Sequence, residues 1–370
     1  MTELEVGKEF LMAVCNEAKM NQRPNCTVSS TMLNIDLLRT DLEAGRISWI
    51  ARKEDFDTVI SGFNLKIASE PLRNDLPGYS DLREALRGSV LLPENLGDLF
   101  QEMKEIEDRK NDPYRYPKQK CLGIDTNIAY RRLLTRLLGY EGITRPKDLN
   151  ARCVQILLPS LVEEEIAAKV GRKYSSSDLD EVGKALGNRW LARSFNNCCY
   201  KDGRKALNAQ TEVKVLKERY NCWDVRGGEF LEDKEARDKE IVKALADHAS
   251  DQNLDLVYLT ADDKSVAHAI AYKLRSIRLK YPNELPERMS LEPWLFIELL
   301  YDLSIVFAAI SLRGLGITIM GDWAGKSADE YYRERLKLII DDGSSLRGIL
   351  EKDHRILARL EKAVDMKKIN

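Results

Sequence analysis

The chain has 370 residues, of which 58 are Lys or Arg and 60 are Asp or Glu, so its formal net charge is −2. This length predicts two or three domains, and the composition is that of a globular protein. The balanced charge excludes a uniformly basic chain, so any nucleic-acid partner has to be met by a local basic patch.

The seven cysteines form no C-x-x-C pair, which argues against a structural zinc site and favours a reducing cytoplasm. The start, Met1–Glu5, lacks the basic region of a secretory signal. The apolar stretch 294–312 contains Glu298 and Asp302, which predicts a buried helix and no membrane partner. With three histidines and no nucleophile motif beside them, acid–base chemistry has to come from carboxylates.

The first part of the chain predicts a mostly helical N-terminal domain, 1–115, of unassigned role. Its expected elements are helices over 3–20, 29–43 and 95–110, with one or two strands within 47–67. The segment 111–120 contains two prolines and predicts the boundary.

After this boundary, apolar runs alternate with helical patterns. Three buried strands are expected at 121–125, 153–161 and 254–263, with 316–320 as a late strand of the same sheet. Expected helices cover 129–138, 162–170, 236–249 and 265–278. Strands that are apolar on both faces predict a parallel sheet covered by helices, which is an α/β domain of three layers over 116–340. The remainder, 341–370, predicts a C-terminal helix that packs on the body or pairs with a second copy of the chain.

A basic insert is expected within this domain, at about 170–230. Between 166 and 226 there are 13 basic and 7 acidic residues, interleaved with the aromatic residues Trp190, Phe195, Tyr200, Tyr220 and Trp223. Two interpretations stay open: a solvated helical insert with a small core of its own, or a surface for a polyphosphate chain. In the second interpretation Lys201, Arg204 and Lys205 contact nucleic acid.

Carboxylates gather where the predicted strands end. Asp125 ends the first strand, and Asp262 lies at the end of the third. Glu165 lies in the helix after the second strand, and Asp238 lies in the first turn of the helix before the third. One such acid is often a helix cap. Four that converge at the carboxyl edge of a parallel sheet repel one another unless a cation holds them, and hard divalent cations prefer oxygen ligands.

These residues carry a resemblance to the PIN-domain nucleases. In order along the chain, the matching segments are G-I-D-T-N (123–127), P-S-L-V-E-E-E-I (159–166), R-D-K-E-I-V-K-A-L-A (237–246) and V-Y-L-T-A-D-D (257–263). The match covers about 120–273. The gap between the second and third acids is longer than is usual in the family, and Glu164 is an alternative to Glu165 as the second acid. The length of the chain favours a multi-domain member over a small toxin.

The resemblance implies a PIN-like fold and hydrolysis of phosphodiester bonds with one or two Mg²⁺ or Mn²⁺ ions, leaving 5′-phosphate ends. It implies that Asp125 and Asp262 are the main metal ligands, and that Asp238 and Glu165 hold a second ion or orient water. Thr260 and Asn127 would hold the carboxylate rotamers. Arg131 and Arg132, one turn after Asp125, are candidate phosphate contacts.

A rival motif, Gly321–Ser327, resembles a phosphate-binding loop but has three residues between its glycines where that loop needs four. We therefore expect no nucleotide cofactor, and we expect Ser327 to cap a helix that begins near residue 328.

The sequence thus predicts a metal-dependent ribonuclease whose partner is single-stranded or structured RNA. Two alternatives remain: a non-catalytic RNA-binding or scaffold protein with a PIN-like fold, and a DNA-directed structure-specific nuclease with the same chemistry.

Overall fold

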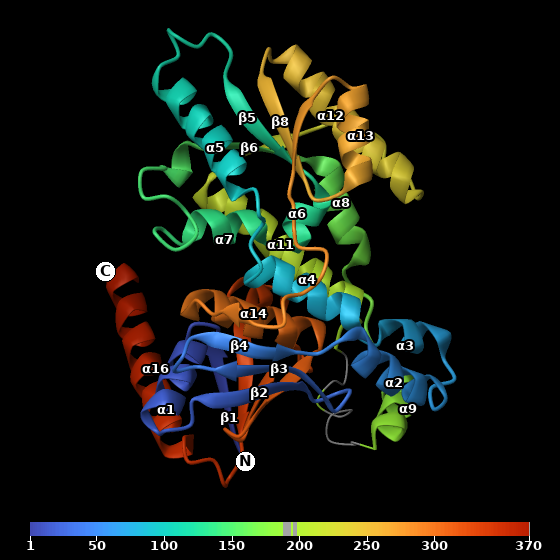
Figure 1. The fold of residues 1–370 in the computed structure, drawn as a ribbon, viewed down its shortest axis with the longest axis vertical. Helices are drawn as coiled ribbons and strands as arrows, with labels where there is room; N and C mark the ends of the chain where they lie inside the picture. The colour runs from blue at the N-terminus through green and yellow to red at the C-terminus, as the bar shows by residue number, and fades with distance from the viewer. Residues whose placement is uncertain (188–193, 195–197, 370) are drawn as a thin grey trace. The chain divides into compact units, whose positions relative to one another are not determined.

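The computed structural model describes residues 1–187, 194 and 198–369, and the chain divides into two compact units (Figure 1). We call them the antiparallel unit and the parallel unit, after their sheets. The antiparallel unit comprises Met1–Leu86, Arg172–Arg204 and Glu284–Asn370, and the parallel unit comprises Arg87–Gly171 and Lys205–Asn283. This division differs from the expected domains 1–115, 116–340 and 341–370, because strands near the start of the chain pair with strands near its end.

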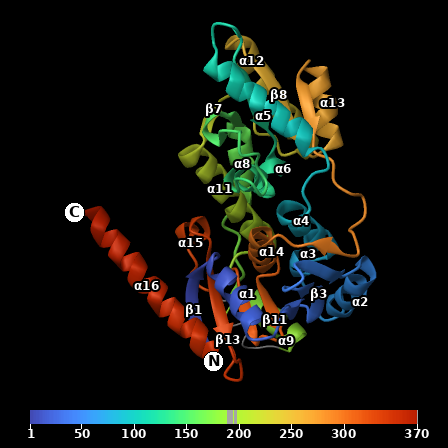
Figure 2. The same ribbon diagram turned by 60° about the vertical axis from the view of Figure 1, so that its left-hand side comes forward.

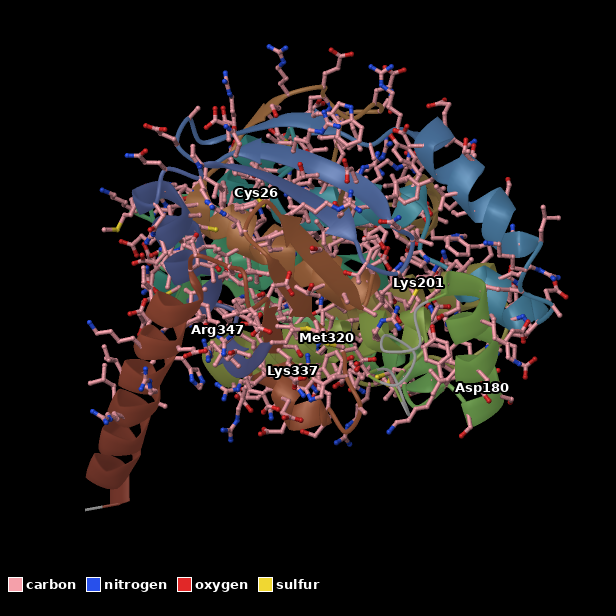
Figure 3. The ribbon with its side chains drawn as sticks, turned by 90° about the horizontal axis from the view of Figure 1, so that it is seen from below. Cys26, Asp180, Lys201, Met320, Lys337 and Arg347 are labelled. Carbon is pink, nitrogen blue, oxygen red and sulfur yellow. The ribbon has the colours of Figure 1, made fainter. Side chains whose placement is uncertain are left out.

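The antiparallel unit is built on an eight-stranded sheet of order β1-β13-β12-β11-β2-β3-β4-β10. The sheet joins the two ends of the chain, because Thr2 in the first strand lies opposite Ile340 in the last. Met320 lies opposite Lys337, and Figure 3 labels these two residues. The strands are β1 (Thr2–Gly7), β2 (Asn25–Ser30), β3 (Ile35–Asp41), β4 (Arg46–Ile50), β10 (Met289–Ser290), β11 (Ala309–Arg313), β12 (Ile317–Met320) and β13 (Arg335–Ile340).

Four predictions for this unit are wrong in whole or in part. Of the helix expected over 3–20, only Phe10–Met20 is helical, and Thr2–Gly7 forms strand β1. The helix expected over 29–43 is the β2–β3 hairpin, which turns through Asn34 at a left-handed φ of 52°. The strand at 316–320 exists, but it pairs in the antiparallel sheet. The segment 1–115 has five helices but is not a domain of its own, because its four strands form this sheet together with later strands and its last part belongs to the parallel unit.

Helices of this unit include α1 (Phe10–Met20), α2 (Lys53–Asn64), α3 (Glu70–Asp75), α4 (Tyr79–Ser89), α9 (Ser176–Leu186), α14 (Pro293–Val306), α15 (Ala328–Tyr332) and α16 (Arg347–Ile369). The apolar stretch 294–312 is divided between the buried helix α14 and strand β11. No helix in the described ranges is long and apolar enough to cross a bilayer. The predicted C-terminal helix is present as α16, at the red end of the chain in Figure 2.

The phosphate-loop-like segment lies between β12 and α15. Ser327 caps α15 in a capping box with Glu330, as predicted. Gly325 adopts a φ of 86°, which favours glycine. The ammonium group of Lys326 donates to the backbone carbonyls of Gly321 and Arg335, at 2.5 and 2.9 Å. These contacts assign the segment a structural role.

The parallel unit contains the predicted parallel sheet, in the order β7-β6-β5-β8-β9. All four pairings are parallel. The strands are β5 (Lys120–Ile124), β6 (Gln155–Pro159), β7 (Asn221–Val225), β8 (Asp255–Thr260) and β9 (Arg275–Arg278). The edge strands β7 and β9 were not predicted. The helix expected over 265–278 ends at Ala271, and the last part of that range, Arg275–Arg278, forms β9.

Helices cover both faces of this sheet, which gives the expected three layers (Figure 1). In β5, Leu122 and Ile124 point to one core, while Cys121 points to the other. The first core is packed by α5 (Leu96–Asn111), α6 (Thr126–Tyr130), α7 (Leu133–Gly139), α8 (Ser160–Lys169) and α11 (Lys201–Arg219), and the second by α12 (Lys234–Asp251) and α13 (Asp263–Ala271). At Gly123 a Cβ would meet Leu245 at 2.9 Å, so α12 packs directly on this strand.

The strand order of the parallel sheet indicates where a ligand would bind. From β5 the chain moves outward to β6 and β7, then crosses back to β8 on the other side of β5 and ends at β9. The direction of winding therefore reverses between β5 and β8. In open parallel sheets, ligands bind beyond the carboxyl ends of the strands at this point. Asp125 is the first residue after β5, and Asp262 is the second residue after β8.

Candidate acidic active site

Asp125 is the most buried acid of the candidate site, with 2% of its surface exposed. One oxygen accepts the Thr126 backbone N–H at 2.7 Å, and the other accepts the Thr260 hydroxyl at 2.6 Å and the Asn127 amide. Burial raises the pKa of Asp125, and these hydrogen bonds offset part of that rise. The predicted supporting roles of Thr260 and Asn127 match these contacts.

Asp262 lies in the turn after β8, where the same side chains order the backbone. The Thr260 hydroxyl accepts the Asp262 N–H at 3.0 Å, and the Asn127 carbonyl oxygen accepts the Ala261 N–H at 3.0 Å. Asp262 in turn caps α13 through the Lys264 N–H, at 3.0 Å. Asp125 and Asp262 are thus both helix caps, so they do not by themselves identify a site.

Glu165 is stronger evidence for a functional site, because it lies within α8 and is not the cap of that helix. It is 4% exposed, and its Oε1 accepts from Arg237 at 3.2 Å and from Lys169 at 3.5 Å. Burial favours a raised pKa, but the Thr126 hydroxyl, Lys169 and Arg237 outweigh it, so the pKa of Glu165 is lowered. The alternative second acid, Glu164, is exposed. The structure therefore places Glu165, and not Glu164, in the site.

Asp238 connects the other three acids. Its pKa is raised to about 6, chiefly by burial and then by the negative charges of Asp125, Glu165 and Asp262, while Lys234 acts in the opposite direction. The other three predicted carboxylates, which come from separate segments, thus each raise the pKa of Asp238. Asp238 is 8% exposed and is not the cap of α12, which is Asp233.

Burial of this carboxylate, together with repulsion from the other acids, predicts that Asp238→Asn stabilises the protein at neutral pH. Below pH 3.8 the Asp238 carboxyl is protonated in both the folded and the unfolded chain, so it does not lower the free energy of unfolding. The loss of stability caused by the ionised carboxylate grows between pH 3.8 and about 6 and is complete above pH 6. We expect urea unfolding at pH 7.5 to show a gain of about 1–2 kcal/mol, after solvent screening is allowed for, and no gain at pH 3.5. Equal gains at both pH values would contradict the repulsion.

The chemistry of this donor set fits a hard divalent cation. Glu165 Oε2 is buried and has no hydrogen-bond partner in the described part of the chain. Asp125, Asp238 and Asp262 would add carboxylate oxygens, the ligand type that Mg²⁺ and Mn²⁺ prefer. Within residues 1–187, 194 and 198–369, however, no three Asp, Glu, His or Cys side chains converge closely enough to hold an ion in the positions they adopt. Binding of an ion by this set would therefore need some of these side chains to change rotamer.

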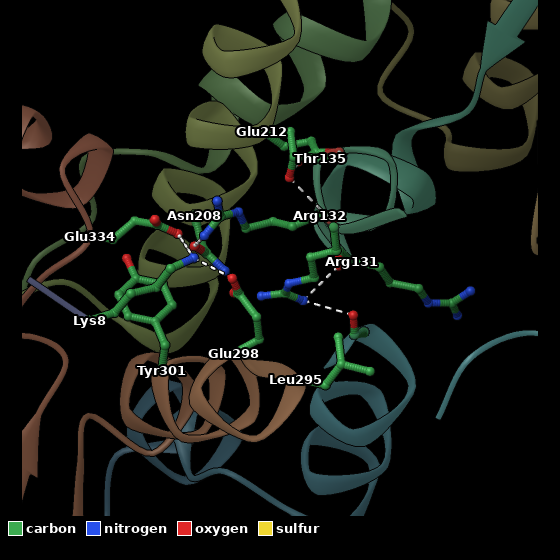
Figure 4. A network of polar contacts seen from close by, with 12 residues as sticks. Lys8, Arg131, Arg132, Thr135, Asn208, Glu212, Leu295, Glu298, Tyr301 and Glu334 are labelled. Atoms are coloured by element: carbon green, nitrogen blue, oxygen red, sulfur yellow. Dashed lines mark hydrogen bonds and ion pairs between the residues drawn. The ribbon is translucent and has the colours of Figure 1, made fainter. Parts of the chain in front are cut away.

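Two of the residues predicted to contact nucleic acid have structural roles instead. Arg204 is fully buried, and its guanidinium donates to the carbonyls of Cys199, Ile305 and Val306 at 2.6–3.0 Å. Arg132 is 3% exposed and lies 3.5 Å from the Asn208 side chain (Figure 4). Its charge opposes the burial that raises the pKa of Glu212. A buried guanidinium cannot reach a phosphate chain, so the prediction is wrong for both.

Of the other three residues predicted to contact nucleic acid, Lys201 and Arg131 already contact other side chains of the protein. Lys201 donates to Asp81 at 3.0 Å and to the Leu76 carbonyl at 3.1 Å, and it stands at the start of α11 (Figure 3). Arg131 lies over the Tyr281 ring at 5.1 Å. Lys205 is half-buried.

The proposed basic surface of the insert is also reduced by ion pairing. Lys217, for example, pairs with Glu163 and Asp224 at 2.8 and 2.7 Å. Trp190 and Phe195 lie outside the described residues. The described part of the insert does not form a core of its own, because it is divided between the two units. Its helix α11 contributes Ala206, Ala209, Val213 and Leu216 to the core of the parallel unit, and the segment also supplies strand β7.

Sequence reasoning missed several groups around the acids. Arg237 is 8% exposed and joins Glu165 to the backbone before α12. The hydroxyls of Thr126, Tyr258 and Ser265 are buried near Asp125 or Glu165. Thr126 follows Asp125 in the sequence, and Arg237 precedes Asp238. Only this adjacency could have indicated from the sequence that these two residues lie at the candidate site.

Comparison of the chain with protein-family models and with curated proteins gives no match.

Proposed function

We propose that the acidic edge of the parallel unit hydrolyses phosphodiester bonds of RNA with the help of divalent cations, as a PIN-like nuclease. The observation that supports this proposal is the placement of Asp125 and Asp262 beyond the carboxyl ends of β5 and β8, where the strand order reverses, together with the buried carboxylates of Glu165 and Asp238. The charges of Asp125, Glu165 and Asp262 all raise the pKa of Asp238. Helix capping accounts for two of these acids but not for Glu165 and Asp238. Buried, mutually repelling carboxylates cost stability, and sites of catalysis are where such costs are found.

In this proposal, Asp125, Asp238, Asp262 and Glu165 hold one or two Mg²⁺ or Mn²⁺ ions. Such an ion, when bound, makes water more acidic and neutralises charge on the phosphodiester in the transition state. Asn127 and Thr260 keep the Asp125 carboxylate in one rotamer through the bonds described above. Arg237 orients Glu165. Hydrolysis then leaves 5′-phosphate and 3′-hydroxyl ends, as the resemblance to the family implies.

The place of action in this proposal is the cytoplasm. All seven cysteines are free in the structure, and burial raises the pKa of Cys15, Cys26 and Cys121 to about 12. Thiols of this kind are unreactive and suit a reducing compartment.

Two glutamates on one helix give a matched test. Glu165→Gln removes a carboxylate from the site, whereas Glu163→Gln removes one that pairs with Lys217. With labelled single-stranded RNA and Mn²⁺, we expect Glu165→Gln to slow cleavage by about 100-fold or more. Glu163→Gln should cut at nearly the rate of the wild type.

Equal rates for the two variants would contradict the assignment of Glu165. Folded wild-type protein that binds RNA but cuts neither RNA nor DNA with either cation would favour the scaffold alternative. Cleavage of structured DNA but not RNA would retain the chemistry and change the substrate.

A further inference from the structure

Phe230 lies beside the acidic site and is 39% exposed. It belongs to the loop 226–233, which leaves the carboxyl end of β7 and leads into α12. The other large apolar side chains described as exposed in the parallel unit are Tyr114, Ile143, Trp223 and Ile270. Of this set, only Phe230 follows the carboxyl end of a strand, which is the edge that holds the four carboxylates.

Backbone geometry and two hydrogen-bonded contacts constrain the loop. Gly227 and Gly228 adopt φ values of 124° and 81°, and a Cβ at Gly228 would meet Leu161 at 2.5 Å. Only glycine accommodates both the backbone angle and this close approach to α8. Arg237 donates to the Leu231 carbonyl at 2.8 Å, and Asp233 caps α12. The position of Phe230 is therefore set by the fold.

Arg237 connects Phe230 to the site. Its guanidinium lies 5.2 Å from the centre of the Phe230 ring, and its Nη2 donates to Glu165 at 3.2 Å. The ring is thus a single side chain away from a site carboxylate. By contrast, Tyr281, after β9, is contacted by two guanidinium groups, those of Arg87 and Arg131, and is only partly exposed.

We infer that Phe230 stacks on an unpaired nucleobase next to the scissile phosphodiester, which makes single-stranded nucleic acid the substrate class. This inference rests on the proposed function. An exposed phenyl ring has no polar group with which to bind a phosphate, but it offers a π face to any base. A base inside a duplex is already stacked and paired, so it is not available to the ring.

Oligonucleotides that carry 2-aminopurine at successive positions test the inference without cleavage. We would titrate them, as RNA and as DNA, into the full-length Asp125→Asn chain with Mg²⁺ present. Quenching should occur at one position or two neighbouring ones. Phe230→Ala should abolish it and weaken binding by roughly 5- to 150-fold. Phe230→Tyr should retain quenching, and Tyr114→Ala, which removes a fully exposed ring before β5, should change nothing.

Unchanged affinity and quenching in Phe230→Ala would overturn the inference, as would equal binding of duplex and single strand. The base-free diester bis(p-nitrophenyl) phosphate separates this failure from failure of the proposed function. If wild-type protein hydrolyses this diester with Mn²⁺ while Phe230→Ala leaves RNA binding intact, the chemistry stands and the stacking role falls. If it hydrolyses no diester but quenching depends on Phe230, the base contact stands and the nuclease proposal falls.

Discussion

Replacing Asp125 with asparagine should lower the rate of phosphodiester cleavage by about 10³-fold or more. The substitution keeps the size of the side chain but removes the charge of the most buried acid in the site. Loss of one metal-binding carboxylate removes several kcal/mol of transition-state stabilisation, and each 1.4 kcal/mol corresponds to tenfold in rate. Single-turnover cleavage of labelled single-stranded RNA with Mn²⁺ measures the change.

The fold of Asp125→Asn should be retained, because burial already disfavours the charged form of this side chain. We expect its unfolding free energy to lie within about 1 kcal/mol of that of the wild type. Asp247→Asn, which changes an exposed acid near the far end of α12, is the matched control and should cut normally. Loss of activity in both variants, or loss of folding in Asp125→Asn, would contradict the role given to Asp125.

Arg204→Met should cause a large loss of stability and no specific loss of nucleic-acid binding. Arg204 is fully buried, and its guanidinium satisfies three backbone carbonyls. Its charge also lowers the pKa of Asp322 against the rise caused by burial. Methionine fills a similar space but leaves these acceptors unpaired, which should cost about 3–5 kcal/mol in urea unfolding.

Lys214→Met on the same helix is the control, because Lys214 forms an exposed pair with Glu218 at 4.0 Å. Such pairs contribute little to stability. Arg204→Lys should be intermediate, since an ammonium group cannot reproduce the fork that reaches three carbonyls. If Arg204→Met is as stable as Lys214→Met but binds RNA more weakly, the structural assignment of Arg204 is wrong.

The parallel sheet was predictable where its strands are buried on both faces. In β5, β6 and β8 nearly every residue is apolar and buried, so the local pattern is sufficient. The edge strands β7 and β9 contain Asn221, Asp224 and Arg275, side chains that a solvent-exposed edge tolerates, and their sequences do not differ from loops.

The antiparallel sheet was not predictable, because its pairings are non-local. β1 depends on β13, more than 300 residues later, and nothing in the local pattern of 2–7 indicates such a partner. In 29–43 the apolar spacing fits a helix and a hairpin about equally well, and the hairpin forms because β2 also pairs with β11. The identity of β12 as a strand was predictable, but its sheet was not.

For the candidate site, the four acids could be listed from the sequence because each follows or flanks a recognisable element. Their interaction, including the raised pKa of Asp238, depends on three-dimensional placement. The basic residues were misjudged for the opposite reason. Arg204 lies in a segment with an excess of positive charge, but burial decides its role, and burial of an arginine leaves no local signal.

The most direct test of the central claim, that these carboxylates form one metal site, is an anomalous difference map from crystals of the full-length chain soaked in Mn²⁺. The account predicts a strong peak among Asp125, Glu165, Asp238 and Asp262, and no such peak in crystals of Asp125→Asn. Absence of a peak at this edge in crystals of the wild-type chain at saturating Mn²⁺ would contradict it, as would Mn²⁺ bound only elsewhere on the molecule.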